Sequence, residues 1–165
     1  MTTAPNPYAA DLGGRDALES IGDTPARIRQ VVAGWTAAQF ERSYAAGKWS
    51  VRNVLIHLAQ TELALGTRVR FALAEQGYTA QPFSQDDWLP LDESIDAATA
   101  LDVYTTLRHM NVGLFRNRSG SDLDREFSHP EYGTLTVRWI LNQLAGHDIH
   151  HLKQIESVAK TQVKG

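Results

Sequence analysis

Residues 137–160 of this 165-residue chain read VRWILNQLAGHDIHHLKQIESVAK, and they constrain its architecture more than any other stretch. On an ideal helix of 3.6 residues per turn, seven side chains of this segment fall within an arc of roughly 80°. They are Val137, Ile140, Leu144, His147, His151, Ile155 and Val158. The pattern predicts a long helix with one buried stripe, in which two histidines occupy positions where leucines are expected.

His147 and His151 are one helical turn apart, so their imidazoles project side by side from one face. Two neutral imidazoles at this spacing can bind one divalent metal ion, and a third histidine would complete a triad that leaves room for water or substrate. The alternative is a pair of core histidines hydrogen-bonded to backbone or to a carboxylate, because an unpartnered buried ring costs free energy. Two histidines within an apolar stripe favour the metal site.

The first helix upstream is predicted to start at Thr24-Pro25, with Thr24 as the N-cap and Pro25 in the first turn. An adjoining segment from about Arg15 extends it only if Gly22 and Pro25 do not interrupt it. A short helix is expected over 36–46.

Two longer helices are expected in the middle of the chain. Ser50 is the predicted N-cap of the first of them, which extends to about Ala74. The second covers about 94–118, with four residues predicted on its apolar side. They are Val103, Leu107, Met110 and Leu114.

Residues 78–91 contain two prolines, and residues 120–136 contain Pro130 and two glycines, so both segments are predicted to be irregular connectors. No stretch alternates with a period of two for long enough to predict a sheet. Four main helices with short and long connections therefore predict an all-α four-helix bundle. We expect a single domain over 15–165, preceded by a flexible N-terminal lead over 1–14.

The composition excludes several classes of function. A net charge of −3 provides no basic surplus for nucleic acid, so we expect none as a partner. The absence of cysteine excludes disulfides, thiolate metal sites and a cysteine nucleophile, so any metal must be held by His, Asp or Glu. No apolar segment is long enough for a signal peptide or a membrane span, so we expect a cytoplasmic protein with no membrane partner.

His57 is a weaker candidate when it is considered alone. It lies about 100° from the centre of the apolar stripe of its helix, on a flank that faces either a neighbouring helix or a cleft. Glu62 lies within that stripe, and its carboxylate either orients an imidazole or, as we expect, extends to solvent. Of the other histidines, His150 is expected to be partly exposed near the site, His109 exposed, and His129 part of a turn or near the pocket mouth.

The segment from His147 to His151 superficially resembles the His-Glu-x-x-His motif of zinc peptidases, with Asp148 in place of the glutamate. Aspartate is one methylene shorter and reaches a metal-bound water poorly. Few residues follow His151, which leaves little room for the remainder of a peptidase fold. The Glu-x-x-His pairs of ferritin-like di-iron bundles are also missing, so we set both alternatives aside.

Three stretches together resemble the DinB-like superfamily of four-helix bundles, which includes bacillithiol transferases and mycothiol-dependent enzymes. They are GKWSVRNVLIHL (47–58), HPEYG (129–133) and GHDIHHLKQI (146–155). They occur in the family's order, and the resemblance covers about residues 15–160. It implies that His57, His147 and His151 are the ligands of a divalent metal, often zinc or nickel, and that the protein is frequently a homodimer.

The resemblance leaves the chemistry open. One expectation is a metal-dependent enzyme that performs thiol S-transfer, with a low-molecular-weight thiol, or hydrolysis on a small-molecule substrate. The other is a non-enzymatic bundle that senses or binds a structural metal, which would be closed by a fourth protein ligand, with Glu62 and His150 as candidates. Trp49, Trp88 and Tyr132 are candidate walls of a cleft between the helices.

Overall fold

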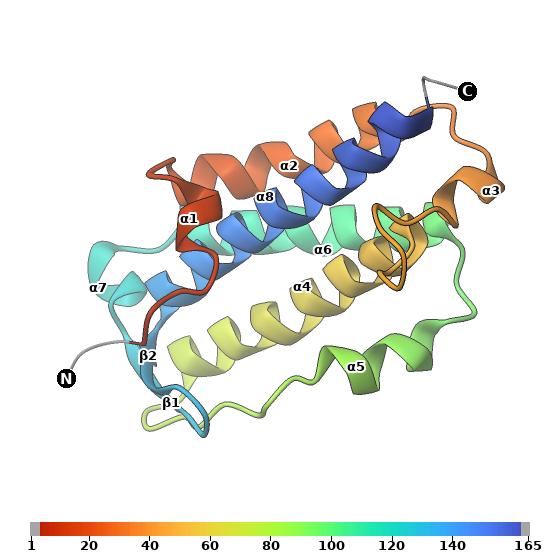
Figure 1. The fold of residues 1–165 in the computed structure, drawn as a ribbon. Coiled ribbons are helices and arrows are strands. Elements are labelled where there is room, and N and C mark those ends of the chain that lie inside the picture. The colour runs from red at the N-terminus through yellow and green to blue at the C-terminus, as the bar shows by residue number, and fades with distance from the viewer. Residues whose placement is uncertain (1–3, 163–165) are drawn as a thin grey trace.

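Four long helices form the body of the computed structural model, which describes residues 4–162. They are α2 (Ala17–Val31), α4 (Val51–Ala74), α6 (Ala97–Arg116) and α8 (Val137–Gln162). Helix α8 packs against α2 on one side and α4 on the other, and α6 packs against both α2 and α4 (Figure 1). The predicted four-helix bundle is confirmed.

Shorter elements occupy the connections. They are α1 (Ala9–Leu12), α3 (Ala37–Phe40), α5 (Gln85–Trp88), the 3-10 helix η1 (Leu89–Asp92), α7 (Gly120–Leu123), β1 (Glu126–His129) and β2 (Gly133–Thr136). The connection that contains α5 runs along α4, and the two strands lie at the end of the bundle where α8 begins (Figure 1). Among residues 4–162, no helix combines the length and apolar character that a membrane span requires.

Helix α4 begins as predicted, because the Ser50 side chain accepts a hydrogen bond from the Asn53 N–H. The predicted start of the first long helix at Thr24 is wrong. Helix α2 begins at Ala17, with Asp16 as its N-cap, and Pro25 lies inside it. Proline lacks the N–H that would bond to the Ile21 carbonyl, and the Arg108 guanidinium donates to that carbonyl instead.

The expectation of no sheet is also wrong. Strands β1 and β2 pair antiparallel, with Phe127 opposite Leu135, and both of these side chains are buried. Each strand has only four residues, so its alternation of buried and exposed side chains is too short to stand out in the sequence. The hairpin covers one end of the core and places His129 beside the interior.

The inward face of α6 differs from the predicted one. Val103 is 41% exposed and Met110 is 52% exposed. The buried face includes Tyr104, Arg108 and Asn111, which are polar, so a search for apolar periodicity selects the wrong side.

The segment predicted as a flexible lead, 1–14, contains α1, which packs against α8 (Figure 1). A Cβ atom added to Gly146 would lie 2.4 Å from the carbonyl oxygen of Tyr8, so the absence of a side chain at Gly146 allows this close approach. The Tyr8 ring lies edge-on to the His147 ring, with centroids 5.1 Å apart. The N-terminal segment therefore reaches the predicted metal site.

Candidate metal centre

His57 from α4 meets His147 and His151 from α8 in the interior of the bundle. The Nε2 atom of His147 lies 2.8 Å from that of His57 and 3.1 Å from that of His151. Although 90 positions separate His57 from His147 in the chain, their rings are in contact. The structure thus brings together the three histidines that the resemblance implied, and His57 on the flank of its stripe faces a neighbouring helix.

All three rings are buried, with exposed fractions of 5% or less. Burial, and then the neighbouring His151, lowers the pKa of His57 to about 3. Burial likewise lowers the pKa of His151 to about 4 and holds that of His147 well below its usual range. The rings are therefore neutral at physiological pH, which is the form that binds metal ions.

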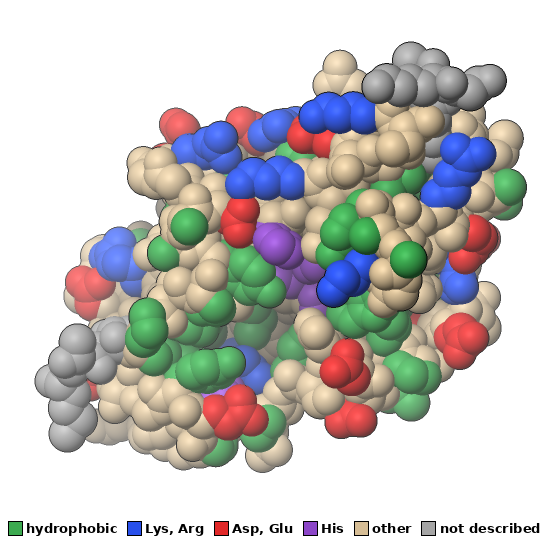
Figure 2. Space-filling model, viewed as in Figure 1, with side chains coloured by type: hydrophobic (Ala, Val, Ile, Leu, Met, Phe, Trp, Pro, Cys, Tyr) green, Lys and Arg blue, Asp and Glu red, His purple; other side chains and the backbone are tan. Residues whose placement is uncertain are grey.

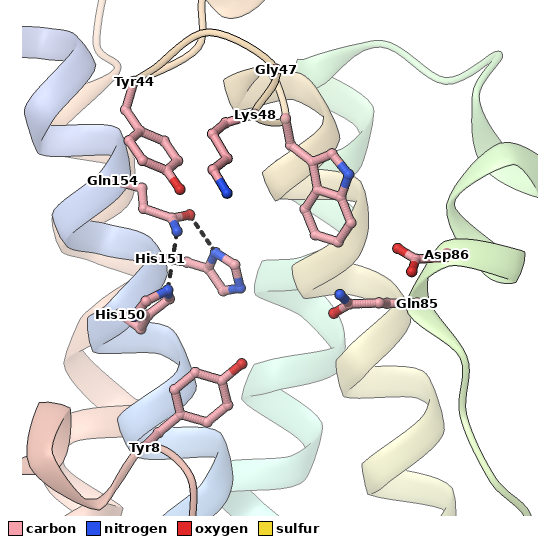
Figure 3. Close-up of a pocket in the computed structure, with 10 residues that line it drawn as sticks. Tyr8, Tyr44, Gly47, Lys48, Gln85, Asp86, His150, His151 and Gln154 are labelled. Carbon is pink, nitrogen blue, oxygen red and sulfur yellow. Dashed lines mark hydrogen bonds between the residues drawn. The ribbon is translucent and has the colours of Figure 1, made fainter.

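Gln154 fixes the orientation of His151. Its side-chain oxygen accepts from His151 Nδ1 at 2.8 Å, and its amide nitrogen donates to His150 Nε2 at 3.0 Å (Figure 3). With the His151 proton on Nδ1, the lone pair lies on Nε2 and faces the other two histidines.

Ordinary core histidines would have hydrogen-bond partners outside the cluster, and within residues 4–162 His57 and His147 lack them at Nδ1. The Nδ1 atoms of His57 and His147 are buried and have no partner among the residues the structure describes. The Asp148 carboxylate lies 4.0 Å from His147 Nδ1, too far for a hydrogen bond. Their Nε2 atoms face each other instead, which is the arrangement expected around a shared cation.

The donor set fits a divalent ion. Zinc lies about 2.0–2.1 Å from imidazole nitrogens, so two nitrogens on one ion are no more than about 4.2 Å apart. The Nε2 spacings of 2.8 and 3.1 Å are within that limit. Within residues 4–162, these three histidines are the one group of His, Cys, Asp and Glu whose ligand atoms cluster closely enough to share an ion.

Neither candidate for a fourth ligand joins the cluster. The prediction that Glu62 extends to solvent is wrong, because it is 1% exposed. Its carboxylate accepts hydrogen bonds from Arg108 and from Asn111. His150 is partly exposed, as expected, and its Nδ1 lies 3.2 Å from the Asp11 carboxylate. The described part of the chain therefore offers three candidate ligand nitrogens at this point and no fourth.

A buried ionic network lies next to the histidines. The Arg108 guanidinium binds Glu62 from α4 and Asp148 from α8, and the Tyr104 hydroxyl also donates to Asp148. Burial alone would lower the pKa of Arg108, but the two carboxylates hold it well above its usual range. Because Asp148 follows His147 directly, the network fixes the stretch of α8 that presents this histidine.

Two cavities adjoin the histidine cluster. A cavity of about 390 Å³ is lined by His57 and His147, and another of about 340 Å³ by His151. Tyr8 and Gln85 line both cavities and lie between them. Figure 2 shows histidine side chains in a hollow near the centre of this face, bordered by hydrophobic side chains.

The predicted aromatic walls are only partly present. Trp49 lines the 340 Å³ cavity, and its ring centroid is 5.0 Å from that of His57. Tyr132 lines the 390 Å³ cavity, whereas Trp88 lines neither cavity and packs against Phe83.

Of the remaining histidines, His109 is exposed as expected, and His129 is buried and lines the 390 Å³ cavity.

Residues 21–155 match the sequence profile of the DinB superfamily. The chain belongs to this superfamily. A similar protein from Oceanobacillus iheyensis is 29% identical over 144 residues, which are 87% of this chain and 84% of that protein. Another, from Bacillus cereus strain B4264, is 26% identical over 87% of this chain and 83% of its own length. Both are named provisionally as metal-dependent hydrolases.

Solved structures show the same DinB-type fold. YfiT from Bacillus subtilis, described as a probable metal-dependent hydrolase with an unusual four-helix bundle topology, matches with a TM-score of 0.82 and 24% identity. The match covers 89% of this chain and 86% of YfiT. A mycothiol-dependent maleylpyruvate isomerase matches with a TM-score of 0.69 and 15% identity, over 94% of this chain and 63% of that one.

In this DinB-superfamily member, three residues beside the histidine cluster were not predicted as site residues. Gln154 has a recognisable signal, since it lies three positions after His151 on the same helix. Lys48 lies in the stretch 47–58 that carries the family resemblance, although no helical pattern singles it out. Tyr8 has no such signal, because it comes from a segment outside the long helices. Tyr8 and Lys48 approach the 340 Å³ cavity from different sides (Figure 3).

Proposed function

We propose that this protein is a metal-dependent enzyme that acts on a small molecule at His57, His147 and His151. The observation behind the proposal is that three buried, neutral imidazoles converge on one point, with no fourth protein ligand among the described residues. A structural metal would be enclosed by protein ligands, whereas this cluster adjoins two cavities. Imidazole donors suit zinc or nickel.

A divalent ion in such a site acts as a Lewis acid, which lowers the pKa of a coordinated water or thiol and polarises a carbonyl group. The protein's own contribution is to hold the donors in place and to keep them unprotonated. Gln154 sets the tautomer of His151, and burial keeps His57 and His147 neutral. The cavities orient the substrate and limit its contact with water.

Hydrolysis is the first candidate reaction, supported by the names of the relatives from Oceanobacillus iheyensis and Bacillus cereus. Water would add to an ester or amide carbonyl, and the bond to the alcohol or amine would break with transfer of a proton to that group. The 390 Å³ cavity has the size of a small-molecule site.

Thiol transfer is the second candidate. It requires two molecules, and the separate cavities on either side of Tyr8 and Gln85 can hold one each. The sulfur of a low-molecular-weight thiol would bond to an electrophilic carbon, the leaving group would depart with its electron pair, and the thiol proton would pass to water. The fold is shared with a mycothiol-dependent isomerase, which makes mycothiol a suitable thiol to test.

The test begins with the metal content of the purified protein, followed by assays of the zinc- and nickel-loaded forms. Aryl esters and amides test hydrolysis, and mycothiol with 1-chloro-2,4-dinitrobenzene tests thiol transfer. His151→Ala should abolish both metal binding and turnover, and the control His109→Ala, at an exposed position of α6, should change neither. Turnover that persists in His151→Ala would contradict the proposal.

A further inference from the structure

The 390 Å³ cavity extends from the histidine cluster along two facing helices. Helix α4 contributes His57, Thr61, Leu65 and Arg68 to its lining. Their spacing places all four within roughly 80° of one helical face. Helix α8 contributes Trp139, Gln143 and His147, which are one turn apart in sequence. The cavity is thus a channel with histidines at one end and an arginine at the other.

Arg68 has no ion-pair partner among residues 4–162, although it lies in a partly enclosed position. Its Nη2 donates to the Gln81 carbonyl at 2.5 Å. That bond uses one of the five N–H donors of a guanidinium. Burial lowers the pKa of Arg68 from its usual range, which marks a charge that is only partly solvated.

His129 adds a second hydrogen-bond donor at the Arg68 end of the channel. Its Nδ1 accepts a hydrogen bond from the Glu131 backbone N–H at 3.2 Å, so the neutral ring has its proton on Nε2. The ring is 5% exposed and lines the cavity. Burial, and then the nearby Arg68 charge, lowers the pKa of His129, which keeps this tautomer neutral at physiological pH.

Two further polar atoms between the ends of the channel lack partners. The Thr61 hydroxyl and the Gln143 side-chain oxygen are buried, and neither has a hydrogen-bond partner among the described residues. Thr61 is only 4% exposed. A buried polar atom without a partner destabilises the folded state, and a bound polar molecule would supply the missing hydrogen bond. Apolar side chains of the lining include Leu65, Leu135 and Phe83.

We infer that this channel binds an elongated small molecule with an anionic group, most simply a carboxylate, held by Arg68 and His129. Its reacting group would then lie at the histidine cluster, so this half of the inference rests on the proposed function. The rise of α4 from His57 to Arg68 is about 16 Å, and the long Arg68 side chain shortens the span. Guanidinium groups pair with carboxylates through two parallel hydrogen bonds.

Glu131 provides a control with the opposite charge, for which the opposite change in binding is expected. It lines the same cavity but is exposed, and it forms no ion pair with Arg68 among the described residues. Its negative charge should weaken the binding of an anionic ligand. Glu131→Gln should therefore strengthen that binding, whereas Arg68→Gln should weaken it.

The experiment measures binding of suberic acid monohydroxamate and of its methyl ester to the zinc-loaded protein by calorimetry. The hydroxamate binds metal, and the two compounds differ only in the charge at the far end. We expect the acid to bind at least about tenfold more tightly than the ester. Arg68→Gln should abolish this preference, Glu131→Gln should increase it, and Arg118→Gln, an exposed arginine that does not line the cavity, should leave it unchanged.

A second arm separates this inference from the proposed metal chemistry. The metal-free protein is titrated with 5-phenylvalerate and with its amide. A preference for the carboxylate that Arg68→Gln removes supports the anion site, even if the protein binds no divalent ion. Equal binding of the carboxylate and the amide, or a preference that Arg68→Gln leaves intact, overturns the inference.

Discussion

Arg108 is a buried charge whose desolvation must be compensated. Its single positive charge pairs with two carboxylates, those of Glu62 and Asp148. All three side chains are 1% exposed or less. Neutral donors complete the network, since Tyr104 donates to Asp148 and Asn111 donates to Glu62. Such a cluster tolerates the loss of one member poorly, because the remaining charges stay buried without compensation.

Arg108→Met should therefore destabilise the protein by about 3–5 kcal/mol, since it leaves two carboxylates buried without their partner. The matched control is Arg29→Met, which removes a pair with Asp102 whose side chains are 44% and 69% exposed. That change should cost at most about 1 kcal/mol. Urea denaturation of both variants measures the difference. Equal losses of stability would show that the buried network contributes no more than the surface pair.

The lowered pKa values of the histidines predict a pH dependence in the absence of metal. In the folded protein His57 titrates at about 3 and His151 at about 4, whereas an unfolded histidine titrates near 6.5. Between these values the unfolded chain binds more protons, so stability is complete above about pH 7 and falls as the pH decreases. Each ring contributes up to about 1.4 kcal/mol per pH unit.

Denaturation of the chelator-treated protein between pH 7 and pH 4 checks this expectation. His57→Gln should flatten the dependence on pH, because it removes one of the shifted groups. The exposed His109→Gln should not change it. A free energy of unfolding that is constant over this range would contradict the buried, neutral state of the rings.

The sequence identified part of this site directly. His147 and His151 stand out because they interrupt an apolar stripe on a single helix, which periodicity detects. His57 does not, since its flank position is compatible with solvent, and only the resemblance to a known family implied its role. Periodicity places Glu62 in the buried stripe, but it does not predict the partner Arg108, because pairing across helices depends on how they dock.

Gly146 decides how closely the N-terminal helix α1 can approach α8. Gly146→Ala would place the alanine Cβ atom 2.4 Å from the Tyr8 carbonyl oxygen and 2.7 Å from the Tyr8 Cβ atom. Backbone atoms cannot yield as a flexible side chain does, so α1 should separate from α8 at a cost of about 1–3 kcal/mol. Hydrogen exchange over residues 4–14 should increase correspondingly.

Gly113→Ala is the matched control for this change. Gly113 lies in α6 and is exposed, and a Cβ added to it would meet no described atom within 4 Å apart from its chain neighbours and the backbone of its own helix. Alanine is favoured over glycine within a helix, so the variant should gain up to about 1 kcal/mol. Unchanged exchange of the N-terminal segment in Gly146→Ala would show that α1 does not depend on this contact.

The helices could be predicted to different extents. Helix α4 begins where its Ser50 cap indicates, because capping is a local property. Helix α2 begins earlier than Pro25 indicates, because Arg108 from α6 satisfies the carbonyl that proline leaves without a donor. The polar inward face of α6 likewise depends on partners in α4 and α8, which local periodicity does not contain.

The bundle as a whole places His57 of α4 and the histidines of α8 on opposite sides of one interface. Helices α4 and α8 pack against each other, and the ionic network of Arg108 adds α6 to the same arrangement. A divalent ion at the histidines would link α4 to α8 directly. Because that ion binds only the folded bundle, its binding free energy adds to the stability of the whole molecule.

Zinc should therefore raise the melting temperature, and a chelator should reverse the change. At a free zinc concentration one hundred times the dissociation constant, the gain is about 2.7 kcal/mol. For a domain of this size that corresponds to a shift of roughly 5–10 °C. His57→Gln retains both ligands of α8 but loses the link to α4, so its shift should be much smaller, while His109→Gln should match the wild type. A full shift in His57→Gln would mean that zinc binds to α8 alone and does not link the two helices.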